Sequence, residues 1–313
     1  MSGNDSTRIL DSAECRETEC LLQTPIPLQA PVSAAHATTM VIEPHHGLLD
    51  LKLGEVWRYR DLVLLFVRRD FVALYKQTIL GPLWYVVQPV MTTLTFTVVF
   101  GRMAKLSTDG LPPFLFYMAG TVIWSYYAAC LTGTASTFIS NAGIFGKVYF
   151  PRLVMPVAQL LSKLISFGIQ LGIFLAFMAY FALQHASIHP NLWLLSVPFL
   201  LLMLAGHGLG AGIIVSAMTT RYRDLQQLVG FGVQLLMYAT PVIYPLSSVP
   251  ARYRLLVELN PIAPVIEAFR YAFLGAGSPS IIWLAYSFGV MLAILAVGLI
   301  LFTRVERTFM DTV

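Results

Sequence analysis

The feature that most constrains this chain is a series of long windows without a charged residue. The windows are 25, 37, 57, 27 and 33 residues long and cover 77–101, 110–146, 164–220, 225–251 and 271–303. Each is longer than the roughly 18–20 apolar residues that a helix needs to cross a bilayer. Only 12% of the 313 residues are charged, where soluble domains carry about 25%. Because lipid offers no partner for backbone polar groups, we expect an all-α polytopic membrane protein.

The windows resolve into six transmembrane helices. The longest window holds two crossings, because "LQHASIHPN" at 183–191 combines a proline with polar residues suited to a turn. The second window holds one crossing, since "TGTASTFISNAGIFG" is too polar for lipid. The predicted spans are 83–101, 114–134, 154–182, 192–217, 226–244 and 281–302. We assign them to one six-span domain that covers residues 81–313.

The distribution of Lys and Arg orients these spans. The membrane-proximal termini and the even-numbered connections carry twelve Lys or Arg residues, whereas the odd-numbered connections carry five. Positive charge is retained on the cytoplasmic side, so both termini are predicted to be cytoplasmic. The longest outer connection, 245–280, includes "LNPIAPVIEAFRYAFLGAG". This stretch is apolar enough to form outer re-entrant helices between spans 5 and 6.

The first 46 residues differ in kind from the rest of the chain. They are rich in Ser, Thr, Pro and Glu and have no apolar run suited to a signal peptide. We expect a mobile cytoplasmic tail over residues 1–46. Its Cys and His residues could be considered as metal ligands, but no ligand spacing supports a site, and we predict none. These residues are Cys15, Cys20, His36, His45 and His46.

Residues 47–80 predict an amphipathic interface helix. Charged residues recur at helical spacings between Leu51 and Lys76, with apolar residues and Trp57 between them. A basic amphipathic helix with a Trp suits the cytoplasmic membrane surface. The Gly81-Pro82 pair is then an elbow that turns the chain into the first span, because proline disfavours helix in the residue before it. The helix either only anchors the protein or also binds a partner or an anionic headgroup.

No catalytic or energy-coupling chemistry is visible within the chain. The nearest approach to a phosphate-binding loop, "GIFGKV" at 143–148, has the wrong spacing and lacks the Ser or Thr. We therefore expect that the chain is not an enzyme by itself and binds no cofactor. His207 lies among glycines, where a packed, hydrogen-bonded imidazole is favoured over a proton relay. Gly208 and Gly212 form a GxxxG pair suited to close helix packing.

Five motifs occur in order along the chain: "YKQTILGPLWYVVQPVMTTLTFTVVFGRMAKL", "SNAGIFGKVYFPRLVMP", "TTRYRDLQQL", "ATPVIYPLSSVPARYRLLVELNP" and "NPIAPVIEAFRYAFLG". From about Gly47 to the C-terminus the chain resembles the permease subunit of type-2 ABC exporters, and among them those for O-antigen and other cell-surface polysaccharides. The resemblance implies a homodimer of permeases with two ATP-binding subunits, which carry the ATP and Mg. It implies export of an undecaprenyl-diphosphate-linked polysaccharide across the bacterial inner membrane, without a nucleic-acid partner.

The resemblance also carries over candidate site residues. The segment that matches the family's ATPase-coupling loop comprises Asn141, Gly143, Ile144, Phe145, Lys147, Tyr149, Pro151 and Arg152. The alternative is that Lys147 and Arg152 only enforce topology. At the cytoplasmic entrance, Arg68, Arg69 and Lys76 are candidates to receive the anionic diphosphate.

Aromatic residues in the second span suggest a path for the glycan. Tyr117, Trp124 and Tyr127 lie at helical spacings, two of them near mid-span. Flat rings and phenol hydroxyls would allow a sugar polymer to slide through many weak contacts. The alternative is packing, since aromatic residues also gather at membrane interfaces.

Two other functions remain open from the sequence. A type-2 ABC permease could carry teichoic acid, a drug or another amphiphile instead of O-antigen. A more distant alternative is an ATP-independent flippase or a membrane glycosyltransferase, although dispersed acidic residues suit the latter poorly.

Overall fold

The structure is a computed structural model that describes residues 53–76, 81–145, 150–151, 153–186, 188–219 and 224–309. The predicted tail at 1–46 lies outside this described part. Within the described residues every regular element is helical and no strand occurs. The predicted all-α class is therefore confirmed.

Five helical segments are long and apolar enough to cross a membrane. They are α3 (Trp84–Phe96) with its π-helical continuation η2 (Thr97–Met103), α4 (Pro113–Phe145), α5 (Val154–Leu183), η3 (Leu192–Ser196) with α6 (Val197–Thr219), and α10 (Ile281–Phe309). They correspond to predicted spans 1, 2, 3, 4 and 6. The predicted fifth span falls on α7 (Leu225–Ala239), which has only 15 residues. The chain is a multi-pass membrane protein, and the count of six spans stays a prediction.

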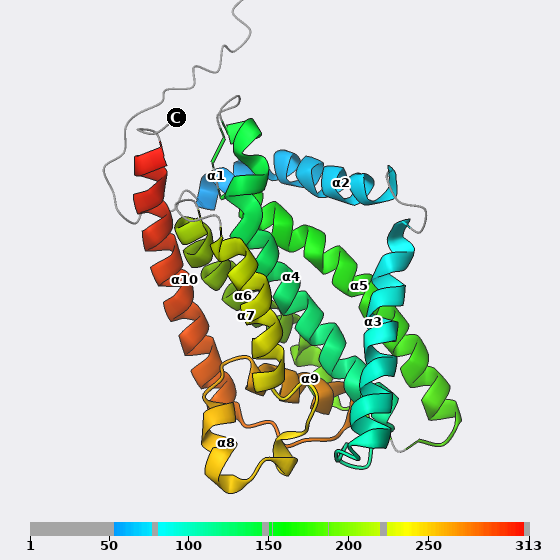
Figure 1. The fold of residues 1–313 in the computed structure, drawn as a ribbon. Helices are drawn as coiled ribbons and strands as arrows, with labels where there is room; N and C mark the ends of the chain where they lie inside the picture. The colour runs from blue at the N-terminus through cyan, green and yellow to red at the C-terminus, as the bar shows by residue number, and fades with distance from the viewer. Residues whose placement is uncertain are drawn as a thin grey trace, which may run out of the picture. The chain divides into compact units, whose positions relative to one another are not determined.

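Helix α4 is the central element, with α3, α5 and α6 packed around it (Figure 1). The contact with α6 depends on glycine. A Cβ atom on Gly208 would lie 2.6 Å from Cβ of Cys130, and one on Gly212 would lie 2.5 Å from Cβ of Thr134. The close packing predicted for this glycine pair is thus confirmed. His207, next to Gly208, is buried, and its Nδ1 lies 2.9 Å from the carbonyl oxygen of Met203.

The predicted interface helix forms two segments, α1 (Leu53–Arg58) and α2 (Arg60–Lys76), interrupted at Tyr59. Helix α2 lies across one end of the membrane helices (Figure 1). Beyond it, η1 (Gly81–Leu83) leads into α3. Gly81 has φ +44°, a conformation that glycine adopts without steric cost. The elbow therefore rests on the glycine as well as on the proline.

Short helices occupy the opposite end of the bundle: η4 (Leu246–Ser248), α8 (Ala251–Glu258) and α9 (Ala263–Leu274). Almost all of α9 is buried within the protein. Asn191, in the α5–α6 connection, binds it twice: its Nδ2 donates to the carbonyl of Tyr271 at 3.0 Å, and its backbone N–H donates to that of Ala272 at 3.2 Å. The Asn191 side chain also accepts from the N–H of Trp193 and caps η3.

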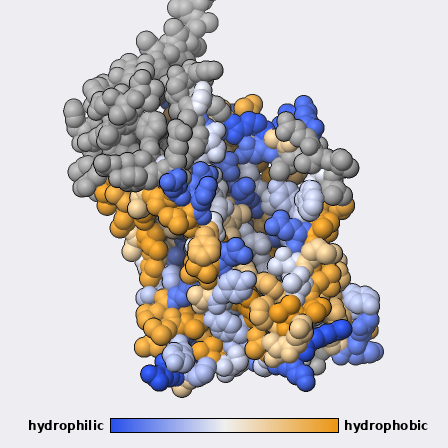
Figure 2. All heavy atoms as spheres, viewed as in Figure 1, coloured by the Kyte–Doolittle hydropathy of each residue, from blue (hydrophilic) through white to orange (hydrophobic). Residues whose placement is uncertain are grey.

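The surface is strongly apolar along its length. Figure 2 shows apolar residues over the α10 side of the molecule, with polar residues gathered toward the two ends. Exposed side chains include Leu183, Leu195 and Ile282, each more than three-quarters accessible. Such a surface is stable against lipid tails and would be costly in water.

Candidate functional site

Helix α2 is attached to the membrane helices by a small apolar cluster. Val63, Phe66 and Val67 of α2 are buried against the start of α5 and the residues before it. The partners are Phe150, Val154, Met155 and Ala158. The rings of Phe66 and Phe150 lie 5.9 Å apart. These buried positions recur every three or four residues, which explains why an otherwise charged helix docks with one face.

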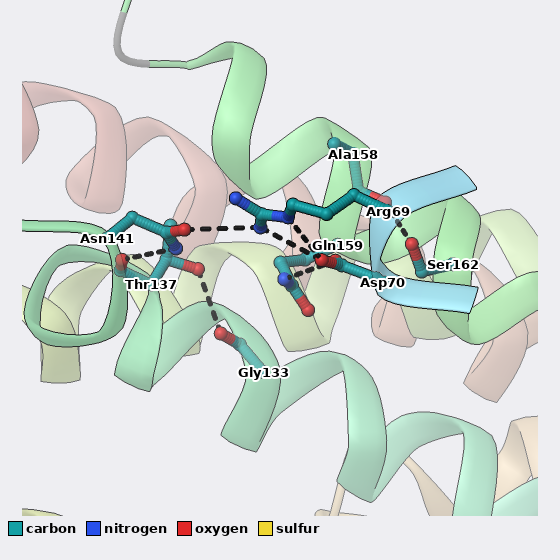
Figure 3. Close-up of polar contacts among 8 residues, drawn as sticks. All are labelled: Arg69, Asp70, Gly133, Thr137, Asn141, Ala158, Gln159 and Ser162. Carbon is teal, nitrogen blue, oxygen red and sulfur yellow. Dashed lines mark hydrogen bonds and ion pairs between the residues drawn. The ribbon is translucent and has the colours of Figure 1, made fainter. Parts of the chain in front are cut away.

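A polar network lies beside this cluster and joins three helices (Figure 3). Arg69 of α2 donates to Oδ1 of Asp70 at 2.9 Å and to Oδ1 of Asn141, at the end of α4, at 3.2 Å. Gln159 of α5 donates to Oδ2 of Asp70 at 2.9 Å. Asn141 also donates to the carbonyl of Thr137 at 2.9 Å. We call Arg69, Asp70, Asn141 and Gln159 the junction network.

The junction network brings together two residue sets that were predicted separately. Arg69 belongs to the predicted diphosphate entrance, and Asn141 belongs to the predicted coupling segment. Because Arg69 is engaged by Asp70 and Asn141 and lies over the ring of Phe66, it holds α2 in place. Arg68 and Lys76 are exposed on the same helix. These two cations lie outside the junction network and can meet an external anion.

The predicted coupling loop is helical where it begins. Asn141, Gly143, Ile144 and Phe145 lie in the last turns of α4, so the expectation of a loop is wrong for these four residues. The reason is that the polar run before them is accommodated inside the protein. The hydroxyl of Thr137, for example, donates to the carbonyl of Gly133 at 2.8 Å. Pro151 is half-buried. Lys147, Tyr149 and Arg152 lie outside the described residues.

The three residues of the predicted glycan path lie in the interior of the protomer. Tyr117 is fully buried, 6.4 Å from the ring of Phe96 in α3. Trp124 and Tyr127 are 5% exposed, with ring centroids 5.3 Å apart. Trp124 also lines a cavity of about 300 Å³ between α3, α4 and α5. Of the three, Trp124 is the residue that the structure places on an open space.

The walls of that cavity carry polar residues that belong to none of the predicted sites. Its polar walls come from Gln88 and Thr92 of α3, Ser125 and Tyr126 of α4, and Lys163 of α5. Tyr85 and Lys163 also line a second cavity of about 310 Å³ that reaches Asp70 and Gln159 of the junction network. Lys163 is a single cation in an apolar helix, and this isolation was its only signal in the sequence.

The described residues include no group of three or more His, Cys, Asp or Glu side chains that could hold a metal ion. The polar groups at the junction are instead arranged to connect helices. An interface helix, the end of the central helix and the start of α5 are held by a charge-assisted network rather than by apolar contacts alone.

The arrangement agrees with comparisons to known proteins. The family model described as ABC-2 type transporter matches residues 61–274, more than half of the chain. An O-antigen export system permease protein of Klebsiella pneumoniae is 27% identical over 80% of this chain and 94% of its own length. One from Myxococcus xanthus is 28% identical over 70% and 82%. The polysialic acid transport protein of Escherichia coli is 22% identical over 74% and 89%. The chain therefore belongs to the ABC-2 type transporter family, as a permease rather than a catalytic subunit.

Proposed function

We propose that this chain is the membrane channel subunit of an ATP-driven exporter in the bacterial inner membrane. Its substrate is a lipid-linked (undecaprenyl-diphosphate) polysaccharide such as O-antigen, which it moves out of the cytoplasm. The observation that carries this proposal is the similarity over 70–80% of the chain to permeases named for O-antigen export. The fold supports it, because passage of such a polymer through the bilayer needs a domain of several membrane-spanning helices.

The active unit is a homodimer of permeases with two ATP-binding subunits. Helix α7 supports a second copy of the chain, since none of its residues is buried and it exposes Leu228, Phe231 and Leu235. In this arrangement α7 makes the fifth of six crossings, and both termini face the cytoplasm. Helices α8 and α9 then lie toward the outer side, in the place of the re-entrant segment.

Coupling to the ATPase takes place at the 141–152 segment. Force on the end of α4 reaches α2 through the bond between Asn141 and Arg69, which are 72 positions apart in the sequence. A short packed element with polar contacts on two helices can transmit a displacement that a free loop would dissipate. Lys147 and Arg152 would meet the partner subunit at the same segment.

The substrate enters beside α2. Arg68 and Lys76 are exposed there and receive the anionic diphosphate, while Arg69 positions the helix. The glycan then passes along the aromatic wall that begins at Trp124, with Tyr117 and Tyr127 behind it. Many weak contacts suit a conduit better than one deep binding site.

Deletion of the gene tests the proposal. Loss of one surface polysaccharide, with the lipid-linked polymer accumulating in the cytoplasm, is the expected result. A plasmid copy should restore the polymer, whereas a copy with Lys147→Glu should assemble poorly or hydrolyse ATP without export. An unchanged surface in the deletion strain would contradict polysaccharide export.

Capsular polysaccharide is the second candidate substrate, favoured by the similarity to the polysialic acid transport protein. Teichoic acid or another amphiphile fits the same family without support from these relatives. The polymer that disappears in the deletion strain separates the three. Loss of a capsule with intact O-antigen would favour the second candidate.

A further inference from the structure

Two neighbouring cavities are lined by residues of α8 and α9 and of the connections near them. These helices lie at the end of the bundle opposite α2 (Figure 1). The larger has a volume of about 550 Å³ and includes Asp109, His189 and Ser247 in its walls. The smaller, of about 340 Å³, adds Glu258 and Trp283. Arg254, Glu267 and Ser278 line both cavities. The shared walls make them adjoining parts of one polar region, which we call the α9 cavities.

The walls of the α9 cavities are held in defined positions. Asp109 has φ +52°, and its Oδ1 accepts a hydrogen bond from Oγ of Ser247 at 2.7 Å. Arg254 is paired with Glu258 at 2.9 Å. Gly277 has φ +108°, and a Cβ atom at this position would lie 2.9 Å from Oε1 of Glu267. A glycine is therefore needed where the backbone passes the carboxylate.

Glu267 is the most informative residue in these walls. Its side chain is 6% exposed, and its Oε2 has no hydrogen-bond partner among the described residues. Buried carboxylates are normally paired, so an unpartnered oxygen beside a cavity indicates that another group can supply the partner. Burial raises the pKa of Glu267, and the nearby charge of Arg270 opposes this effect.

The α9 cavities combine three kinds of recognition. Asp109, Glu258 and Glu267 offer acceptor oxygens, and Arg254 with Ser278 offers donors. Trp283 offers a flat apolar ring. A neutral sugar carries hydroxyl groups that both donate and accept, and a ring face of C–H groups that packs on an indole. A phosphate would instead meet like charge from the carboxylates.

We propose that the α9 cavities bind neutral sugar residues of the exported polymer as it leaves the membrane domain. This inference rests on the proposed function, which places this end of the bundle on the outer side. The walls are prearranged but open, and the volumes lie within the range of small-ligand sites. Binding of single residues there would hold the leading end of the glycan weakly and repeatedly, as passage requires.

Saturation-transfer NMR on the full-length permease in lipid nanodiscs tests this site. Nanodiscs are needed because common detergents carry sugar headgroups. The probes are the methyl glycosides of glucose, galactose, mannose and rhamnose at millimolar concentration, with glucose 6-phosphate as the anionic comparison. We expect saturation of at least one neutral glycoside, centred on its C–H protons. Glucose 6-phosphate should show at least fivefold less.

Two variants locate the signal. Asp109→Asn keeps a residue that tolerates positive φ, and Ser278→Phe fills the space shared by both cavities; each should lower saturation at least fivefold. Lys105→Asn is the matched control, because Lys105 has φ +51° in the same connection and lines neither cavity. Its signal should match the wild type.

Three results would overturn the inference. One is the absence of saturation for every neutral glycoside, and a second is equal saturation in Ser278→Phe and wild type. The third is an increase of the melting temperature with CaCl₂ but not with the glycosides. If Asp109→Asn abolished that increase, the cavities would be a cation site. If a strain still exports its polymer while the glycosides fail to bind, the inference about the α9 cavities is wrong and the proposed function stands.

Discussion

The two ends of the helix bundle differ in how their polar side chains are hydrogen-bonded. At the α2 end, Arg69, Asp70, Asn141 and Gln159 are all hydrogen-bonded to one another or to the backbone. At the α9 end, Glu267 and Arg270 are more deeply buried, yet Oε2 of the first and Nε of the second have no partner among the described residues. The first arrangement binds helices together. The second surrounds cavities.

This difference separates two roles. A satisfied network fixes helix positions and can transmit a displacement from the partner-facing segment to the interface helix. Incompletely satisfied groups beside a cavity raise the free energy of that region and leave hydrogen-bonding capacity for a ligand. The contrast predicts that substitution of the buried Arg270 at the α9 end alters stability most, and that substitutions at the junction alter export most.

The largest expected effect on stability comes from Arg270→Leu. The Arg270 guanidinium is buried, donates to the carbonyl of Val242 and lies 3.9 Å from the ring centroid of Phe116. Its removal leaves Glu267 without the strongest of its neighbouring positive charges, at a cost of about 3 kcal/mol. Thermal unfolding in nanodiscs measures this. Arg252→Leu, at an exposed position on α8, is the control and should change little. Equal losses in both variants would remove the contrast between the two ends.

A double-mutant cycle tests the junction network. Arg69→Ala and Asn141→Ala should each cost about 1 kcal/mol, and the double variant should cost little more than one single variant, because both remove the same bond. Export should fall while ATP hydrolysis by the assembled complex continues. Arg60→Ala, on the same helix but outside the junction network, is the control. Additive losses together with normal export would mean that the bond transmits nothing.

The pH dependence of stability tests the buried carboxylate at the α9 end. Burial raises the pKa of Glu267 above its ordinary value of 4.5. Its contribution to folding is therefore complete below that value and is lost as the pH rises through the higher folded pKa. Glu267→Gln should flatten the melting temperature across this range, whereas Glu258→Gln should not. A wild-type curve that rises with pH and is unaffected by Glu267→Gln would show that the carboxylate is not protonated on folding.

The smallest effect on stability is expected for Arg254→Gln. The ion pair with Glu258 is an i,i+4 pair whose arginine side chain is 48% exposed. Such pairs contribute about 0.5 kcal/mol or less. The same substitution should nevertheless weaken saturation of the glycoside probes, since Arg254 lines both α9 cavities. A large loss of stability would mark Arg254 as a structural residue.

Local sequence patterns predicted those features of the fold that depend on one helix alone. Charge-free windows located five spans, because length and polarity suffice to recognise a crossing. The predicted span at 226–244 ran past Pro241, but the helix ends at Ala239 and the following residues form a buried turn. Proline has no N–H to continue the helix, so this boundary was available from the sequence.

The contacts between distant segments could not be predicted in the same way. Thr137 and Asn141 made the end of α4 look like a loop, because nothing nearby in the sequence shows that their polar groups are satisfied inside the protein. The bond from Arg69 to Asn141 depends on how α2 crosses the bundle. Likewise, Glu267 is buried because α9 packs between other elements. The prediction of a re-entrant connection did not specify that packing.

Asn191, in the α5–α6 connection, links two helical elements. One side chain caps η3 at the start of the α6 span and donates to the end of α9, and its backbone N–H adds a second bond to the same helix end. These bonds tie the end of α9 to the start of the α6 span. A flap-like movement of α9 alone would have to break them, whereas a movement that carries the start of the α6 span along with α9 would keep them.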